Sequence, residues 1–224
     1  MLKLFTVILL VVTSYACSGL EDAEVMNADV YQGYRFEYDE ATNETYIGAV
    51  FKLNSEDGEV IKLASPALLK VNDQVCGYNA EDVDFPYSLS FTSRLPEAVL
   101  DFIDYKKQEF VNKMELDSIV QVKDFVTVID SASHQIKVSF VGDDRCPGEM
   151  LKLIVSAKGK ELSYDIAGTD SNTIVVNEDI LKDFKGELVS MKLCRIKNID
   201  LLNVSPAGGS VQFVYASKIK EVQL

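Results

Sequence analysis

The chain has 224 residues, of which 47% are hydrophobic and 25% are charged, with 12 Gly and 5 Pro. This composition is typical of a globular protein and excludes a collagen-like, low-complexity or wholly disordered chain. The 35 acidic residues outnumber the 22 Lys and Arg, and a net charge of −13 repels the phosphate backbone of nucleic acid. We therefore expect no nucleic-acid partner.

Residues 1–16 have the parts of a secretory signal peptide. A short cationic region contains Lys3, an apolar stretch covers residues 4–12, and small residues around Ala16 form a cleavage region. The apolar stretch is too short for a helix that spans the hydrocarbon core of a bilayer, which needs about 20 residues. The sequence therefore predicts export, with no membrane-spanning segment downstream.

Cys17 follows directly after the predicted cleavage point. The junction Ser14-Tyr15-Ala16-Cys17 resembles the lipobox of bacterial lipoproteins. This resemblance implies that Cys17 is acylated and anchors the protein in a membrane, because each buried CH₂ of a lipid chain contributes ~0.8 kcal/mol. Since Ser18 and not Asp comes next, it also implies the outer membrane. Plain cleavage after Ser14-x-Ala16, followed by secretion without lipid, is the alternative.

Beyond a polar tether at residues 17–28, short runs of residues alternate between hydrophobic and polar and are separated by turn signals. The runs lie at residues 46–53, 60–63, 83–91, 136–140, 151–155, 162–166, 188–196 and 211–215. Strands at such spacing are typical of antiparallel sandwiches and barrels. The chain is therefore expected to be all-β.

Two segments are compatible with helices. Residues 97–114 fit either a helix that begins at Pro96-Glu97 or a hairpin with strands near Val99–Ile103 and Glu109–Met114. The β-rich surroundings favour the hairpin. Residues 178–184, which follow a capping Asn177, predict a second, short helix.

The order of strands and turns carries a second resemblance, most clearly at residues 51–73 and 207–217. In this order the chain resembles uncharacterised bacterial envelope lipoproteins built from tandem immunoglobulin-like β-sandwiches. The resemblance implies two consecutive antiparallel sandwich domains, at residues 29–117 and 118–224. It implies no known activity.

The four cysteines are Cys17, Cys76, Cys146 and Cys194. If Cys17 carries lipid, three thiols remain and one disulfide at most forms, which export permits. We expect Cys146 to pair with Cys194, because both lie in the same half of the chain, and a bridge from Cys76 to Cys146 is the alternative. The spacings match no zinc site, and we expect no metal or other cofactor.

The sequence carries no convincing catalytic signature. The only histidine, His134, lies in a polar stretch that shows no nucleophile elbow or orienting acid. Ser217 and Lys220 match the spacing S-x-x-K, but on a strand their side chains point to opposite faces. Acidic clusters such as residues 81–84 are expected in a chain with 35 acids, and this one lacks the loop glycine and terminal Glu of an EF-hand.

Tyr31, Tyr34 and Tyr38 give the first predicted strand an aromatic stripe. Such a stripe contacts a sugar or a protein partner where it is exposed, and fills the core where it is buried. The sequence thus predicts a non-catalytic, lipid-anchored cell-envelope protein that acts by binding or spacing through its loops and strand edges. The alternative is a secreted or surface glycan-binding module that uses these tyrosines, and a hydrolase that uses clustered acids is the third hypothesis.

Overall fold

The computed structural model describes residues 26–115, 122–130, 135–142, 148–166 and 173–224. These residues form three sheets, named here the large, the four-stranded and the three-stranded sheet. The large sheet has the spatial order β12 (Lys160–Ile166), β11 (Met150–Ala157), β14 (Leu188–Asp200), β15 (Gly209–Ala216), β1 (Val30–Asp39), β2 (Glu44–Leu53), β6 (Tyr87–Phe91) and β5 (Gly77–Tyr78), and β16 (Lys220–Gln223) pairs with β14. The four-stranded sheet has the order β4 (Gln74–Val75), β3 (Leu68–Val71), β7 (Glu97–Ile103) and β8 (Glu109–Glu115). The three-stranded sheet has the order β13 (Thr173–Asn177), β10 (Gln135–Gly142) and β9 (Val122–Asp130).

The prediction of an all-β protein with antiparallel sheets is confirmed. Every strand pair in the described ranges is antiparallel except β1 with β15. The segment predicted as a short helix forms the 3-10 helix η2 (Glu178–Phe184).

The hairpin at residues 97–115 is also confirmed, as β7 and β8. Along β8, Phe110, Asn112 and Met114 are buried while the residues between them are exposed, which is the period of two expected for a strand with one covered face. The Asp104 carboxylate closes the connecting turn by accepting a hydrogen bond of 2.8 Å from the Gln108 backbone N–H.

Two predicted strands are shorter than expected. The run at residues 83–91 pairs only as β6, after Pro86. Proline has no backbone N–H to donate to a neighbouring strand, so the ladder begins beyond it. The run at residues 60–63 forms no strand, and its contact with β2 is a single bridge between Lys52 and Val60.

The arrangement as two consecutive immunoglobulin-like domains is not confirmed, because the large sheet crosses the predicted boundary at residues 117/118. Strand β15 lies parallel to β1 over eight residue pairs, from Gln32–Gly209 to Asp39–Ala216. On its other side β15 pairs with β14. The backbone of β15 is therefore satisfied partly by the N-terminal half and partly by the C-terminal half of the chain.

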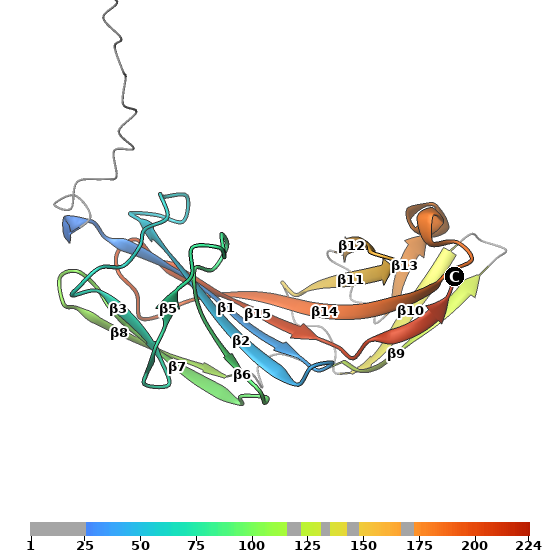
Figure 1. Cartoon of the computed structure of the whole chain (residues 1–224), viewed down its shortest axis with the longest axis horizontal. Coiled ribbons are helices and arrows are strands. Elements are labelled where there is room, and N and C mark those ends of the chain that lie inside the picture. The colour runs from blue at the N-terminus through green and yellow to red at the C-terminus, as the bar shows by residue number, and fades with distance from the viewer. Residues whose placement is uncertain (1–25, 116–121, 131–134, 143–147, 167–172) are drawn as a thin grey trace, which may run out of the picture.

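One face of the large sheet carries a continuous core. Phe36, Phe51 and Phe213 from the large sheet share this core with Phe102 of the four-stranded sheet and Val138 of the three-stranded sheet. The two smaller sheets lie toward opposite ends of the long strands β14 and β15 (Figure 1). The large sheet thus joins the two ends of the molecule.

The opposite face of the large sheet is named here the outer face. Because paired residues on neighbouring strands share a face, Gly33 shares this one with Val50 and Ser210, and Arg35 shares it with Gln212. A separate apolar cluster of Cys194, Ile196, Val214 and Ala216 lies here too.

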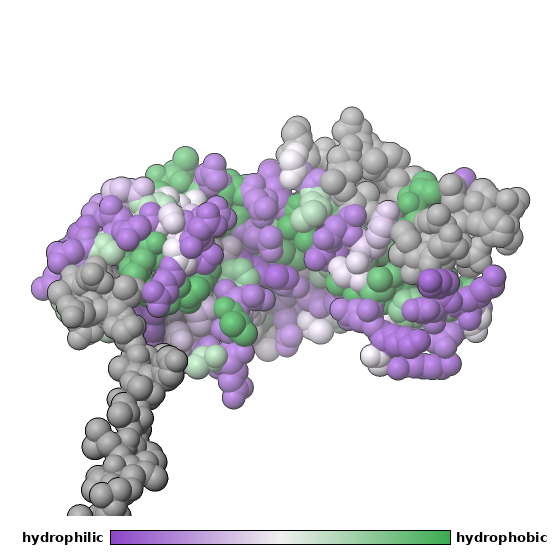
Figure 2. All heavy atoms as spheres, turned by 90° about the horizontal axis from the view of Figure 1, so that it is seen from above, coloured by the Kyte–Doolittle hydropathy of each residue, from purple (hydrophilic) through white to green (hydrophobic). Residues whose placement is uncertain are grey.

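Seen from above, the described surface is mostly hydrophilic, and its hydrophobic residues form small separate groups (Figure 2). This side of the described part of the molecule therefore presents no broad apolar patch of the kind that marks a large hydrophobic interface.

Candidate functional site

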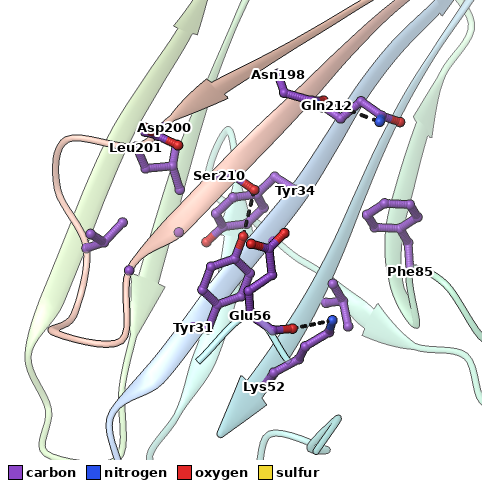
Figure 3. Close-up of a pocket in the computed structure, with 15 residues that line it drawn as sticks. Tyr31, Tyr34, Lys52, Glu56, Phe85, Asn198, Asp200, Leu201, Ser210 and Gln212 are labelled. Carbon is purple, nitrogen blue, oxygen red and sulfur yellow. Dashed lines mark hydrogen bonds between the residues drawn. The ribbon is translucent and has the colours of Figure 1, made fainter. Parts of the chain in front are cut away.

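A hollow of about 600 Å³ lies on the outer face, where β14, β15, β1 and β2 run side by side. Figure 3 shows Tyr31 and Ser210 near its centre, Phe85 on one side and Asp200 on the other. A volume of this size falls in the range of small-molecule sites, about 300–1,000 Å³. The hollow is therefore the first candidate for a binding site.

Glycines on neighbouring strands deepen the hollow. Gly33 on β1 has no side chain, and a Cβ there would lie 2.9 Å from a methyl group of Val50 and 3.6 Å from the Tyr31 ring. At Gly48 on β2, a Cβ would lie 2.7 Å from the Cβ of Phe85. The missing side chain of Gly48 therefore lets Phe85 lie directly against the sheet, and that of Gly33 leaves space for the close approach of Val50.

Hydrogen bonds hold the polar groups of the hollow in place. The Tyr31 and Ser210 hydroxyls lie 2.8 Å apart. The Gln212 amide donates to Asn198 Oδ1 at 3.3 Å. The Lys52 ammonium donates to the backbone carbonyl of Glu56 at 2.6 Å. The lining thus combines amides, hydroxyls and carboxylates on a partly aromatic floor.

The pKa of Tyr31 is raised, chiefly by burial, and the Ser210 hydrogen bond opposes this shift. The carboxylates of Glu56 and Asp200 raise it further, because a negative charge nearby disfavours the phenolate. The negative charges of Glu56 and Asp200 therefore act on the Tyr31 hydroxyl at the centre of the hollow.

The three tyrosines of the predicted stripe have different environments. Tyr31 lines the hollow, although it is only 7% exposed. Tyr34 borders the hollow but is 2% exposed and donates to Gln32 Oε1 at 3.2 Å. Tyr38 lies in the core against Tyr215 and donates to Asn43 Oδ1 at 3.0 Å. Of the three, only Tyr31 is placed to contact a ligand through its side chain on the outer face.

A second hollow of about 400 Å³ lies beside the first on the outer face. Its floor contains the apolar cluster around Cys194 and Val214, and charged side chains such as Arg35 and Lys192 surround it. Gln212 lines both hollows. The two hollows thus adjoin at Gln212, and together they are named here the outer-face groove.

The acidic cluster at residues 81–84 is organised by hydrogen bonds within the chain. Asp82 accepts hydrogen bonds from the Tyr46 hydroxyl at 3.0 Å and from the Phe85 backbone N–H at 2.9 Å. Within the described ranges, no three His, Cys, Asp or Glu side chains are grouped so as to hold a metal ion. Asp82 instead positions Phe85 at the side of the hollow.

Tyr46 is expected to make the stability of the protein fall at alkaline pH. Burial, followed by the hydrogen bond to Asp82, raises the pKa of Tyr46 from 10.0 to about 12. The stabilisation from this shift is complete below pH 10 and is lost as the pH rises toward 12, because the unfolded chain releases the proton first. The free energy of unfolding from urea titrations should therefore fall less steeply over this range in Tyr46→Phe than in the wild type. Tyr78→Phe, at an exposed position, is the control, and equal slopes for wild type and Tyr46→Phe would contradict the assignment.

The predicted disulfide between Cys146 and Cys194 stays a prediction. Cys194 is a buried free thiol in the structure, and Cys146 lies outside the described residues. Burial raises the pKa of the Cys194 thiol to about 12 and that of Cys76 to about 11. Both thiols are thus kept protonated and slow to react at neutral pH.

Other sequence candidates are either engaged elsewhere or outside the described residues. The Ser217 hydroxyl accepts from the Leu193 N–H at 3.0 Å and donates to the Lys218 carbonyl at 2.9 Å, so it is held by backbone. His134, the signal segment 1–16 and Cys17 lie outside the described residues.

Sequence reasoning missed most residues of the groove. Phe85, Asn198, Asp200, Ser210 and Gln212 come from segments far apart in the chain. The outward positions of Asn198, Asp200, Ser210 and Gln212 could be inferred from strand alternation, but that of Phe85, which precedes β6, could not. Nothing in the sequence indicates that β15 pairs with β1. None of the described ranges contains a helix with the length and apolar character of a membrane span. Compared with known proteins, the chain matches no family model and no curated sequence.

Proposed function

We propose that this protein is a non-catalytic, lipid-anchored component of a bacterial cell envelope that binds a partner through the outer-face groove. The observation that carries the proposal is the groove itself, in which two hollows of about 600 and 400 Å³ share Gln212. Concave sites with a few fixed polar groups are the usual form of a binding site.

The arrangement of the groove favours binding over catalysis. General acid–base and nucleophilic mechanisms most often depend on a histidine, and the described residues that line the two hollows include none. The hydroxyls of Tyr31 and Ser210 are hydrogen-bonded to each other, and the pKa of Tyr31 is raised and not lowered. These groups are suited to hold a ligand and not to attack one.

Anchoring through Cys17 accounts for the N-terminal sequence. The tether at residues 17–28 would connect the lipid directly to β1, the strand that borders the groove. The protein would thus display its groove close to the membrane, with the outer membrane as the proposed site. The partner is an envelope protein or a glycan, and the strongly acidic charge argues against nucleic acid.

The proposal is tested by crosslinking in cells, with a photoreactive amino acid at position 212 and, as control, at the exposed position 223 of β16. We expect specific adducts from position 212 and none from position 223, because only Gln212 lines the groove. Incorporation of labelled palmitate in the same cells should be lost in Cys17→Ala. Equal adducts at both positions, or none at position 212, would contradict binding at the groove, and label retained by Cys17→Ala would contradict the anchor.

The second candidate is a secreted or surface glycan-binding module. The aromatic side chains of Tyr31 and Phe85 beside hydrogen-bonding amides favour this version. It differs from the first in lacking the lipid, so the palmitate measurement separates the two.

A further inference from the structure

The groove is lined by equal numbers of basic and acidic side chains, although the protein as a whole is strongly acidic. Among the described residues that line its two hollows, four are basic and four are acidic, whereas the whole chain has a net charge of −13. Three of the basic side chains form ion pairs of 2.6–3.4 Å, and the fourth, Lys52, donates to a backbone carbonyl. An anionic ligand would have to displace these partners while facing Glu56 and Asp200, so the charge distribution favours a neutral ligand.

The centre of the groove offers uncharged hydrogen-bonding groups. The amides of Asn198 and Gln212 and the hydroxyl of Ser210 lie on adjacent strands β14 and β15. Each amide has two N–H donors and a carbonyl acceptor, of which the bond between Gln212 and Asn198 uses one donor and one acceptor site. The remaining amide donors and acceptors suit a ligand that is rich in hydroxyl groups.

Two aromatic rings lie beside these polar groups. Phe85 is partly exposed, and its ring lies against Gly48 at one side of the first hollow (Figure 3). The more deeply buried ring of Tyr31 lies nearer the centre, with its hydroxyl at Ser210. An aromatic ring provides a rigid apolar surface, which matches the C–H face of a pyranose.

We infer that the outer-face groove binds a neutral oligosaccharide, with one sugar ring against Phe85 and hydroxyl groups on the Asn198–Gln212 pair. This inference rests on the proposed function, since it names the class of ligand for the same surface. Because Gln212 lines both hollows, a chain of several sugars occupies both of them.

The test measures binding of the purified full chain to neutral hexasaccharides (cellohexaose, maltohexaose and chitohexaose) and to the acidic hexagalacturonate by calorimetry. We expect at least one neutral hexasaccharide to bind, and more tightly than the trisaccharide of the same sugar. Phe85→Ala and Gln212→Ala should each raise the Kd about tenfold, the effect of losing one ring contact or one well-placed hydrogen-bonding group. Phe91→Ala and Gln223→Ala, which replace the same residue types outside the groove, should leave the Kd within about twofold of wild type. Unchanged thermal midpoints for Gln212→Ala and Gln223→Ala show that the loss is not one of folding.

Each other outcome overturns the inference in a distinguishable way. Binding of hexagalacturonate alone would show that the class of ligand is wrong. Neutral binding unaffected by Phe85→Ala and Gln212→Ala would show that the site is wrong. If no sugar binds while position 212 crosslinks to a protein in cells, the sugar inference fails and the proposed function stands. If neither occurs, both fail.

Discussion

Replacing Arg195 with Met is expected to lower the free energy of unfolding by about 3–5 kcal/mol. Arg195 is fully buried in β14, and its guanidinium donates two hydrogen bonds to the buried Glu149, from Nε to Oε1 at 2.8 Å and from Nη2 to Oε2 at 2.5 Å. Without the guanidinium, the carboxylate of Glu149 stays in a medium of low dielectric without its bidentate cation. Urea denaturation followed by circular dichroism measures the change.

Two further variants isolate the buried pair as the cause. Arg35→Met removes a guanidinium that pairs with Glu37 at 2.6 Å on the outer face, where both side chains are partly exposed. Arg35→Met should lower the free energy of unfolding by no more than about 1 kcal/mol, as is usual for exposed ion pairs. The double variant Arg195→Met with Glu149→Leu should recover much of the loss, since no buried charge is left behind. A cost below about 1 kcal/mol for Arg195→Met itself would show that the pair does not stabilise the fold.

Replacing Phe51 with Ala is expected to lower the free energy of unfolding by about 3–5 kcal/mol, because buried apolar surface is lost and a cavity is created. Phe51 on β2 is fully buried, and its ring centroid lies 4.6 Å from that of Phe102 and 5.5 Å from that of Tyr87. It therefore joins the large sheet to the four-stranded sheet. The same urea titration measures the loss.

Phe91→Ala is the matched control for Phe51→Ala, because Phe91 is only partly buried at the end of β6. Phe91→Ala should lower the free energy of unfolding clearly less, because the Phe91 side chain is already partly exposed in the folded protein. Equal costs for the two variants would mean that the contact between the two sheets is not centred on Phe51.

The local elements could be predicted from the sequence because their signals lie within a few residues. The alternation in β8 and the turn at Asp104–Gln108 are local signals of the hairpin, although the choice between a hairpin and a helix also needed the β-rich surroundings. Asn177, which the sequence predicts as a cap, directly precedes η2. The predicted strand at residues 83–91 was too long because the hydrophobic–polar alternation of the sequence continues across Pro86, whereas the backbone pairing begins only after it.

The candidate site could be predicted only in part. The aromatic stripe directed attention to β1, but Tyr34 and Tyr38 lie on the core side and Tyr31 on the other. Phe85 gave no signal, since its position depends on the missing side chain of Gly48 and on Asp82, which accepts from its backbone N–H.

The amino-acid sequence by itself determined that this chain forms strands, where most of them turn, and which side chains alternate, because a strand's two faces are encoded by residues two apart. Only the tertiary structure decided that β15 lies beside β1 and that a groove forms across β14, β15, β1 and β2. The physical reason is that strands pair through backbone groups which all residues share, so the choice of a partner some 180 residues away depends on how the whole core packs.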